Sequence, residues 1–243
     1  MPQRPNRPGE EPPASVSSPQ HSSDTSDAVP TVESGAIPAA TAHRLGLYLR
    51  ELQHFQRAGI ATIKSSALGH RLGLSDSQIR RDLALFGEFG KRGVGYEVAG
   101  LVDALRKALG TDGTWNTILV GLGNLGSALV RYRGFQQQGF VLRAVFESDP
   151  TKIGTEVNGI PVFSIDALEE KIPQLNARLA VLAVPAEPAP ALARRLSDAG
   201  ISGILNFAPV SLPVQKELAI VDVDLAVELQ RLAFAVANSD RSG

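Results

Sequence analysis

The spacing of apolar residues changes near residue 115. Between Ala39 and Gly110 these residues recur every three or four positions, which is the spacing of one face of an α-helix. From Thr117 onward, short apolar runs alternate with helical segments. This alternation is typical of a parallel sheet that is covered by helices on both faces. The pattern therefore predicts an α/β protein with a mainly helical first part.

The first part has the pattern of a helix-turn-helix with a wing. A first helix ends near Gly59, and two short helices follow, joined by residues 72–75. Ser75 begins the second short helix, and Gln78, three residues later, completes a capping-box pattern. Residues 90–96 are rich in glycine and carry two cations, which predicts a β-turn that forms a wing. A closing helix then ends at Gly110.

The apolar pattern of the second part predicts five buried strands with helices between them. The strands are expected at residues 117–120, 140–147, 179–184, 203–207 and 218–223, with helices at 124–132 and 191–199. A last helix, Asp224–Ala237, is apolar on nearly all sides. A helix of this kind must be buried, and a second subunit is a natural cover for it.

Six residues between the first predicted strand and its helix carry a dinucleotide-binding fingerprint. They are Gly121, Leu122, Gly123, Asn124, Leu125 and Gly126, and Glu147 follows at the end of the next strand. The expected roles are a tight turn at Gly121, backbone approach to a pyrophosphate at Gly123 and close packing at Gly126. Glu147 would accept hydrogen bonds from the adenine ribose and favour NAD over NADP. The alternative is an α/β turn without a ligand.

Positive charge is concentrated in the predicted winged helix. Residues 39–112 have a net charge of +4, whereas the whole chain has a net charge of −1. Ser65, Ser66 and Ser75 could donate to phosphates from helix starts, and Gln78 could read adenine if it does not form the capping box. Arg80 and Arg81 lie on the exposed side of the same helix. The alternative is a solvated basic face.

Several absences narrow the function. The chain has no cysteine, which excludes disulfides and thiolate metal sites and favours a reducing cytoplasm. No apolar run is long enough for a membrane helix. All four histidines precede the fingerprint and none has metal-ligand spacing, so neither a metal site nor a hydride-transfer enzyme is expected. Residues 1–38 have the composition of a disordered tail.

Four motifs resemble the Rex family of redox-sensing transcriptional repressors. They are IRRDLALFGEFGKRGVGYEV (79–98), VGLGNLGSALVRYRGF (120–135), AVFESDPTKIG (144–154) and GILNFAPV (203–210). The resemblance implies a homodimer that binds palindromic operators when NAD or no ligand is bound and is released by NADH. It implies a winged helix over 39–112, a Rossmann domain over 113–223 and an exchanged dimerisation helix over 224–237.

The resemblance also assigns residues to roles. DNA contacts match Arg80, Arg81, Lys91, Arg92 and Gly93. The wall near the nicotinamide matches Val184, Pro185, Asn206, Phe207 and Pro209, and a tyrosine linked to sensing the cofactor's redox state matches Tyr132. Arg50 and Asp224 match a pair that links the two domains. The family often has Asp where Glu147 stands, and the longer acid should still reach a ribose. Arg81 replaces a common Lys and Leu225 replaces Phe in some members, so we expect differences in operator detail and in the packing of the last helix.

Two other classes of function remain open from the residues themselves. One is an NAD-dependent enzyme with a basic N-terminal appendage, against which the missing acid/base residue argues. The other is a nucleotide- or CoA-binding module that acts through protein contacts, against which the wing cations argue.

Overall fold

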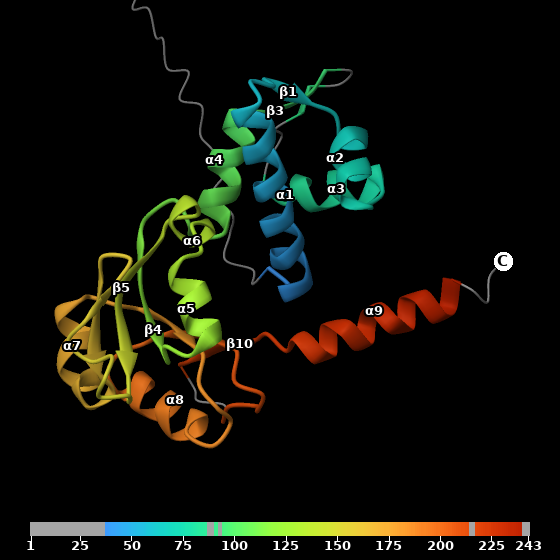
Figure 1. Ribbon diagram of the computed structural model, residues 1–243. Helices are drawn as coiled ribbons and strands as arrows, with labels where there is room; N and C mark the ends of the chain where they lie inside the picture. The colour runs from blue at the N-terminus through green and yellow to red at the C-terminus, as the bar shows by residue number, and fades with distance from the viewer. Residues whose placement is uncertain (1–36, 87–89, 92–93, 214–216, 240–243) are drawn as a thin grey trace, which may run out of the picture.

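The computed structural model describes residues 37–86, 90–91, 94–213 and 217–239. The predicted tail therefore lies almost wholly outside the described residues, as do Arg92 and Gly93 of the predicted wing. Figure 1 shows two groups of elements, one built from the first four helices and one built around a sheet, with a long last helix projecting from the second group.

The N-terminal domain packs four helices against a small antiparallel sheet. The helices are α1 (Ala39–Arg57), α2 (Ser65–Leu72), α3 (Asp76–Ala84) and α4 (Val98–Ala108), and the sheet has the order β1 (Thr62–Ile63), β3 (Gly95–Glu97), β2 (Gly90–Lys91). Apolar faces of all four helices form one core that includes Leu52, Leu68, Ile79 and Leu105. This arrangement agrees with the predicted helix-turn-helix and wing.

The turn between α2 and α3 follows from its residues. Gly73 ends α2 in the left-handed conformation, with φ at 65°, which glycine adopts without steric cost. Ser75 then caps α3, because its side chain accepts a hydrogen bond from the Gln78 amide. In the wing, Lys91 of β2 lies opposite Gly95 of β3.

The C-terminal domain contains a seven-stranded sheet in the order β10-β9-β8-β4-β5-β7-β6. All neighbouring strands are parallel except β6 and β7. The first six strands of this list have the order of a dinucleotide-binding fold, in which the chain reverses direction across the sheet between β4 and β8. The strands are β4 (Trp115–Val120), β5 (Phe140–Glu147), β6 (Glu156–Val157), β7 (Ile160–Ser164), β8 (Leu179–Leu182), β9 (Gly203–Asn206) and β10 (Ala219–Asp222).

Five helical segments accompany this sheet. They are α5 (Asn124–Val130), α6 (Gly134–Gln137), the 3-10 turn η1 (Ile165–Ala167), α7 (Leu168–Gln174) and α8 (Ala189–Asp198). The sequence patterns did not predict β6, β7, α6, η1 or α7. These elements are short, and Pro161 in β7 and Pro173 in α7 interrupt the local signal.

The two faces of the sheet are covered unequally. Helices α7 and α8 pack on one face, whereas α5 covers the other face only around β4 and β5. The described residues between β9 and β10 contain no helix that could cover the rest. The prediction that helices cover both faces is therefore wrong for this half of one face.

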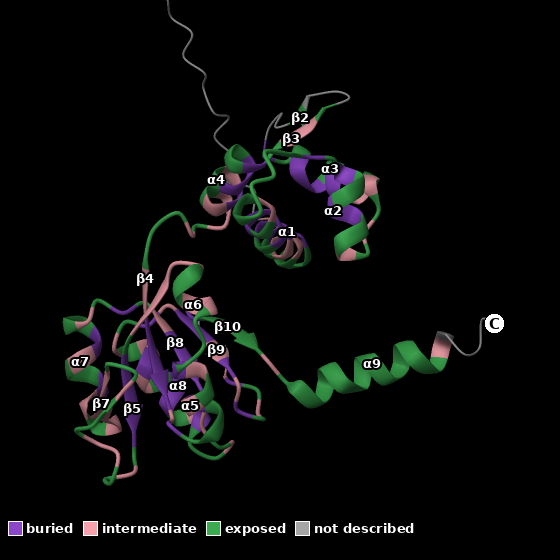
Figure 2. Cartoon of the chain, turned by 45° about the horizontal axis from the view of Figure 1, so that its top comes forward, coloured by how far each residue is buried: buried purple, intermediate pink, exposed green. Residues whose placement is uncertain are grey.

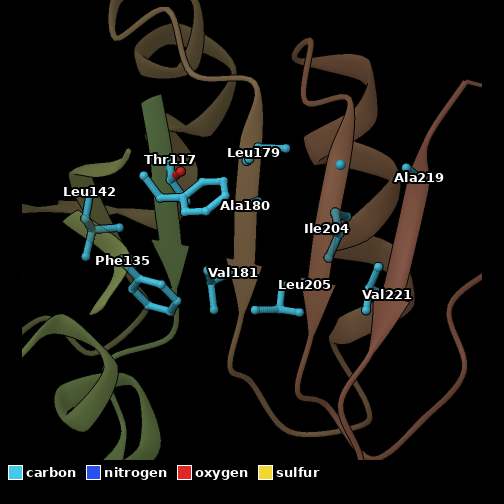
Figure 3. A pocket seen from close by; sticks show the side chains of 12 residues that line it. Thr117, Phe135, Leu142, Leu179, Ala180, Val181, Ile204, Leu205, Ala219 and Val221 are labelled. Atoms are coloured by element: carbon cyan, nitrogen blue, oxygen red, sulfur yellow. The ribbon is translucent and has the colours of Figure 1, made fainter. Parts of the chain in front are cut away.

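The uncovered half is an apolar groove with a volume of about 360 Å³. Val181, Leu205 and Val221 stand in register on three neighbouring strands and line it (Figure 3). Val181 is almost fully buried, whereas Val221 at the sheet edge is 61% exposed. Phe135, which follows α5, borders the groove on its other side.

The last helix, α9 (Leu225–Ser239), projects into solvent. Figures 1 and 2 both show it extending away from the sheet domain with an exposed surface. Six large apolar side chains on it are exposed: Leu225, Val227, Leu229, Leu232, Phe234 and Val236. The predicted burial is therefore not found within one chain.

Candidate functional site

A pocket opens where the carboxyl ends of β4 and β8 meet. It has a volume of about 550 Å³ and is lined by the glycine loop, the end of β5 and the start of α8. This is the reversal point of the sheet, where dinucleotide-binding folds hold their ligands. Val184 and Pro185, which were predicted near a nicotinamide, line the pocket.

The three glycines of the fingerprint differ in what surrounds them. A Cβ at Gly121 would strike the Ala183 carbonyl, and φ there is +96°. A Cβ at Gly126 would strike the Gly121 carbonyl, so the helix and the strand approach each other too closely for a side chain. A Cβ at Gly123 would meet no protein atom within 4 Å. Gly123 therefore leaves space that a ligand can use, which fits the backbone-approach role.

The start of α5 suits an anion. Gly123 caps this helix, and no side chain caps it among the residues that the structure describes. Uncapped first-turn amides and the helix dipole favour a phosphate at such an end. The residues present therefore fit the pyrophosphate of a dinucleotide.

Glu147 lies at the base of the pocket but is turned toward its own backbone. One carboxylate oxygen accepts a 2.6 Å hydrogen bond from the Leu122 amide, and the other accepts bonds from the Ser148 and Asp149 amides. Burial alone would raise the pKa of Glu147, but the amide donors outweigh it and hold the pKa below its usual value. A ribose must therefore compete with, or share, these amide contacts.

Two basic residues in the pocket were not predicted. The Lys152 ammonium donates to the Leu122 carbonyl at 3.2 Å and lies 4.0 Å from Glu147. Arg195 is held by Glu169 through two hydrogen bonds of 2.6 and 2.9 Å. Lys152 lies five residues after Glu147 in the motif 144–154, and this spacing could have identified it.

Three other residues that the resemblance assigns to the nicotinamide lie outside the pocket lining. Asn206 is buried, and its side chain holds the following loop through the Val210 carbonyl and the Ala208 amide. Phe207 packs in the apolar cluster beneath α5, and Pro209 is exposed. The structure therefore gives Asn206 a structural role in this chain.

Tyr132 is also placed away from the pocket. It follows α5 at the end opposite to the glycine loop, where it packs edge-on against Phe135. Its surroundings include Arg131 and Arg133. Within one chain Tyr132 is therefore not among the residues that line the nucleotide pocket.

Arg50 and Asp224, the predicted linking pair, are not brought together. Arg50 lies 3.6 Å from Glu51 on its own helix. Asp224 caps α9, because its carboxylate accepts hydrogen bonds from the Ala226 and Val227 amides at 2.8 and 3.2 Å. Any contact between them belongs to another conformation or to another copy of the chain.

The exposed side of the helix-turn-helix carries the predicted basic residues. Arg80 donates a 3.3 Å hydrogen bond to the Ser65 hydroxyl, so α3 and the start of α2 meet at one surface. Ser66 is exposed beside it. Arg81 is exposed and forms no ion pair with the described residues, which leaves its guanidinium available to a polyanion. The Lys91 backbone lies in β2 of the wing.

Gln78 forms only half of the predicted capping box. Its amide N–H donates to Ser75, but its side chain turns the other way and donates to Asp82 at 2.8 Å. With its nitrogen donating to the carboxylate one helical turn ahead, the Gln78 side chain does not reach back to accept from the Ser75 backbone N–H.

Comparisons with known proteins match both parts of the chain. A family model described as "Putative DNA-binding protein N-terminus" matches residues 36–84, and one described as "CoA binding domain" matches residues 112–210. The redox-sensing transcriptional repressor Rex of Carboxydothermus hydrogenoformans is 48% identical over 200 residues, which cover 82% of this chain and 96% of the relative. This chain belongs to the Rex family.

Solved structures of the family agree with this assignment. RSP, a Rex-family repressor, has been solved with NAD+ and operator DNA, and it matches with a TM-score of 0.78 and 33% identity over 85% of this chain and 95% of that one. RSP with NADH matches with a TM-score of 0.76. The Rex of Rhodopirellula baltica is 48% identical over 80% of this chain and 82% of its own length.

Family membership confirms the predicted α/β fold and the class of function. Rex proteins are named as transcriptional repressors, so the chain is a regulator rather than an enzyme despite its dehydrogenase-like pocket. Among the described residues, no group of three or more acidic or histidine side chains could hold a metal ion. None of the helices in the described ranges combines the length and apolarity that crossing a membrane requires.

Proposed function

We propose that this protein is a dimeric operator-binding repressor that binds DNA in the presence of NAD or without a ligand and releases it when NADH is bound. The observation that carries the proposal is the combination of a dinucleotide pocket and a basic winged helix in one Rex-family chain. RSP, whose fold matches across both domains, binds NAD+, NADH and operator DNA.

In this proposal the DNA surface is built around α3. Arg81 contacts a phosphate, and Arg80 faces the same strand, oriented by its hydrogen bond to Ser65. Ser65 is itself buried, so it does not offer the phosphate contact that the sequence predicted. The uncapped start of α2 adds Ser66 and two free amides, since Lys64 provides no side-chain cap. The wing residues Lys91, Arg92 and Gly93 would reach the neighbouring minor groove.

The nucleotide occupies the pocket between β4 and β8, and each part of it meets a different group. Its pyrophosphate lies over Gly123 and the start of α5, and its adenine ribose approaches Glu147. The negative charge of Glu147 disfavours a 2′-phosphate and so selects NAD(H) over NADP(H). The nicotinamide lies toward Val184 and Pro185.

The operator is read by two copies of the chain, with α9 of each copy packed on the other. Six exposed apolar side chains on α9 need a cover, and the apolar groove over β8–β10 lacks the helix that would complete its sheet face. The α9 helix of one copy would cover the groove of the other copy. This complementarity favours a dimer with exchanged α9 helices over two separate monomers. Two recognition helices at a fixed spacing then match an inverted repeat.

Because the pocket and the DNA surface belong to different domains, NADH must act through the arrangement of the two copies. One arrangement spaces the α3 helices for the operator, and the other does not. NADH shifts the balance only as far as it binds the second arrangement more tightly. Arg50, Tyr132 and Asp224 are the residues proposed to change partners between the two.

A gel-shift titration on an A·T-flanked inverted-repeat duplex tests the proposal. We expect binding without ligand and with NAD, and release when NADH is added. A half-length duplex with one repeat is the matched control and should bind much more weakly. The proposal is wrong if NADH leaves the complex intact at concentrations that saturate the pocket, or if no inverted repeat is bound.

A further inference from the structure

A buried carboxylate joins α3 to α1. Asp82 is 4% exposed and accepts hydrogen bonds from three side chains. The Arg44 guanidinium donates to both oxygens at 2.7 and 2.8 Å, and the Tyr48 hydroxyl donates at 2.7 Å. The remaining donor is the Gln78 amide nitrogen at 2.8 Å. Aspartate is rarely this buried unless it is paired, so each of these donors compensates its burial.

The carboxylate is fixed in orientation as well as in charge. Arg44 holds it in a two-bond fork and is itself anchored by Thr41 at 3.1 Å. Arg44 thereby keeps the pKa of Asp82 below its usual value, so Asp82 stays an acceptor at neutral pH. One oxygen also takes Tyr48, and the other also takes Gln78.

This arrangement determines which way the Gln78 amide faces. Asp82 can only accept, so the nitrogen of Gln78 must point toward it and the carbonyl oxygen must point elsewhere. Gln78 is half-buried and bonded to the buried carboxylate, while Arg81, three residues later on the same side of the helix, is exposed to solvent. Gln78 keeps its carbonyl oxygen and one N–H for another contact.

An acceptor and a donor side by side on one amide match the N6 and N7 edge of adenine in the major groove. We propose that Asp82 is a positioning residue that presents the Gln78 amide to an A·T pair of the operator, with the two-bond fork of Arg44 holding Asp82 in place. The inference rests on the proposed function, in which α3 enters the major groove. Asp82 itself does not touch DNA.

The test measures discrimination position by position rather than affinity alone. Binding is measured for the full-length protein on an operator and on duplexes in which each base pair of the half-site is replaced singly. We expect one A·T position at which replacement weakens wild-type binding by about 5- to 150-fold. In Gln78→Ala this position should lose its discrimination, while the other positions keep theirs.

Asp82→Asn preserves the shape of the side chain but replaces one carboxylate oxygen with an NH2 group, so the side chain no longer offers only acceptors to the Gln78 amide. This variant should lose discrimination at the same base pair. Adding Asp82→Asn to Gln78→Ala should cause no further loss of discrimination. Tyr48→Phe removes a donor from the oxygen that Gln78 does not use, so it is the matched control and should keep the wild-type profile. Arg44→Lys keeps the charge but loses the fork, and it replaces Asp82→Asn if that variant does not fold.

The possible outcomes distinguish a failure of the positioning role of Asp82 from a failure of operator binding. A wild-type profile in Gln78→Ala, or a uniform loss across all positions in both Asp82→Asn and Arg44→Lys, overturns the positioning role but leaves operator binding standing. If the wild-type protein binds no inverted repeat, the proposed function itself fails.

Discussion

The nucleotide pocket and the groove over β8–β10 lie in the same sheet but differ in how complete they are. Helix α8, the glycine loop and β5 enclose the pocket within one chain. The groove has apolar walls and no helix of its own to cover it, while α9 of the same chain projects away from it. One chain therefore forms the nucleotide pocket but does not bury its own apolar surface.

This difference separates the two activities. Nucleotide binding should be a property of each chain, whereas operator binding should require two chains held at a fixed spacing. A change in the groove or in α9 should then affect DNA and spare the nucleotide, and a change at the glycine loop should do the reverse.

Removal of residues 224–243 is expected to have the largest effect. Without α9 the groove has no partner helix, so the protein should become a monomer or aggregate and operator binding should be lost. NADH affinity of any soluble monomer should stay within about threefold, because no residue of the pocket lining is removed. Light scattering measures the oligomeric state, and an NADH titration measures the affinity.

A point variant sharpens the same comparison. Phe234 is 72% exposed in one chain. If α9 stays in solvent, Phe234→Asp should have little effect on the protein. If a second copy covers α9, the same variant should dissociate the dimer. Arg231→Ala, which breaks an exposed pair with Glu228, is the control and should leave the dimer intact. A protein that remains a soluble dimer after removal of residues 224–243 contradicts the account.

Arg81→Ala should abolish or strongly weaken operator binding and leave NADH affinity unchanged. Arg81 forms no ion pair with described residues, so its loss should cost the fold little. Each lost phosphate contact should lower the salt dependence by about 0.9 in the slope of log affinity against log salt. Arg178→Ala on the sheet domain, where Arg178 bonds Ser202, is the control. An unchanged salt slope would remove Arg81 from the interface.

Gly123→Ala should weaken NADH binding about tenfold or more by placing a methyl group where the pyrophosphate approaches. The protein should remain folded and should bind its operator, because that methyl group meets no protein atom. The operator complex should then resist NADH. Gly113→Ala, also at an open position, is the matched control. If Gly123→Ala binds NADH normally, the ligand lies elsewhere.

Asp224 offers a smaller and more selective change. Asp224→Ala removes both the charge and the cap of α9, which costs about 1 kcal/mol at a typical helix start. Asp224→Asn keeps a cap and removes only the charge. If the charge links the domains, both variants should reduce the factor by which NADH weakens operator binding. A reduction in Asp224→Ala alone would assign Asp224 to helix capping.

Much of the fold follows from sequence signals that are local. Gly73 and the glycine run act through their own backbone, and the Ser75 side chain caps the helix that directly follows it, so the helix-turn-helix and the β4–α5 turn were predictable. Helix α7 was not, because Pro173 lies inside it and tertiary packing of Ile172 overrides the local signal.

The site was less predictable wherever a side chain has a choice of partners or a second copy of the chain is needed. Nothing in the spacing of Ser75 and Gln78 shows that Asp82 takes the Gln78 side chain. Residue type alone does not reveal that the Glu147 carboxylate accepts a hydrogen bond from the Leu122 amide. The apolar surface of α9 predicts that it needs a cover but not that its own chain leaves it exposed.

The central claim is that NADH and operator DNA are linked through two arrangements of the dimer. The most direct measurement is the NADH affinity of the full-length protein with and without saturating operator duplex. If NADH weakens operator binding 100-fold, the coupling is about 2.7 kcal/mol, and the operator must weaken NADH binding by the same factor. An NADH affinity that saturating operator leaves unchanged would contradict the account.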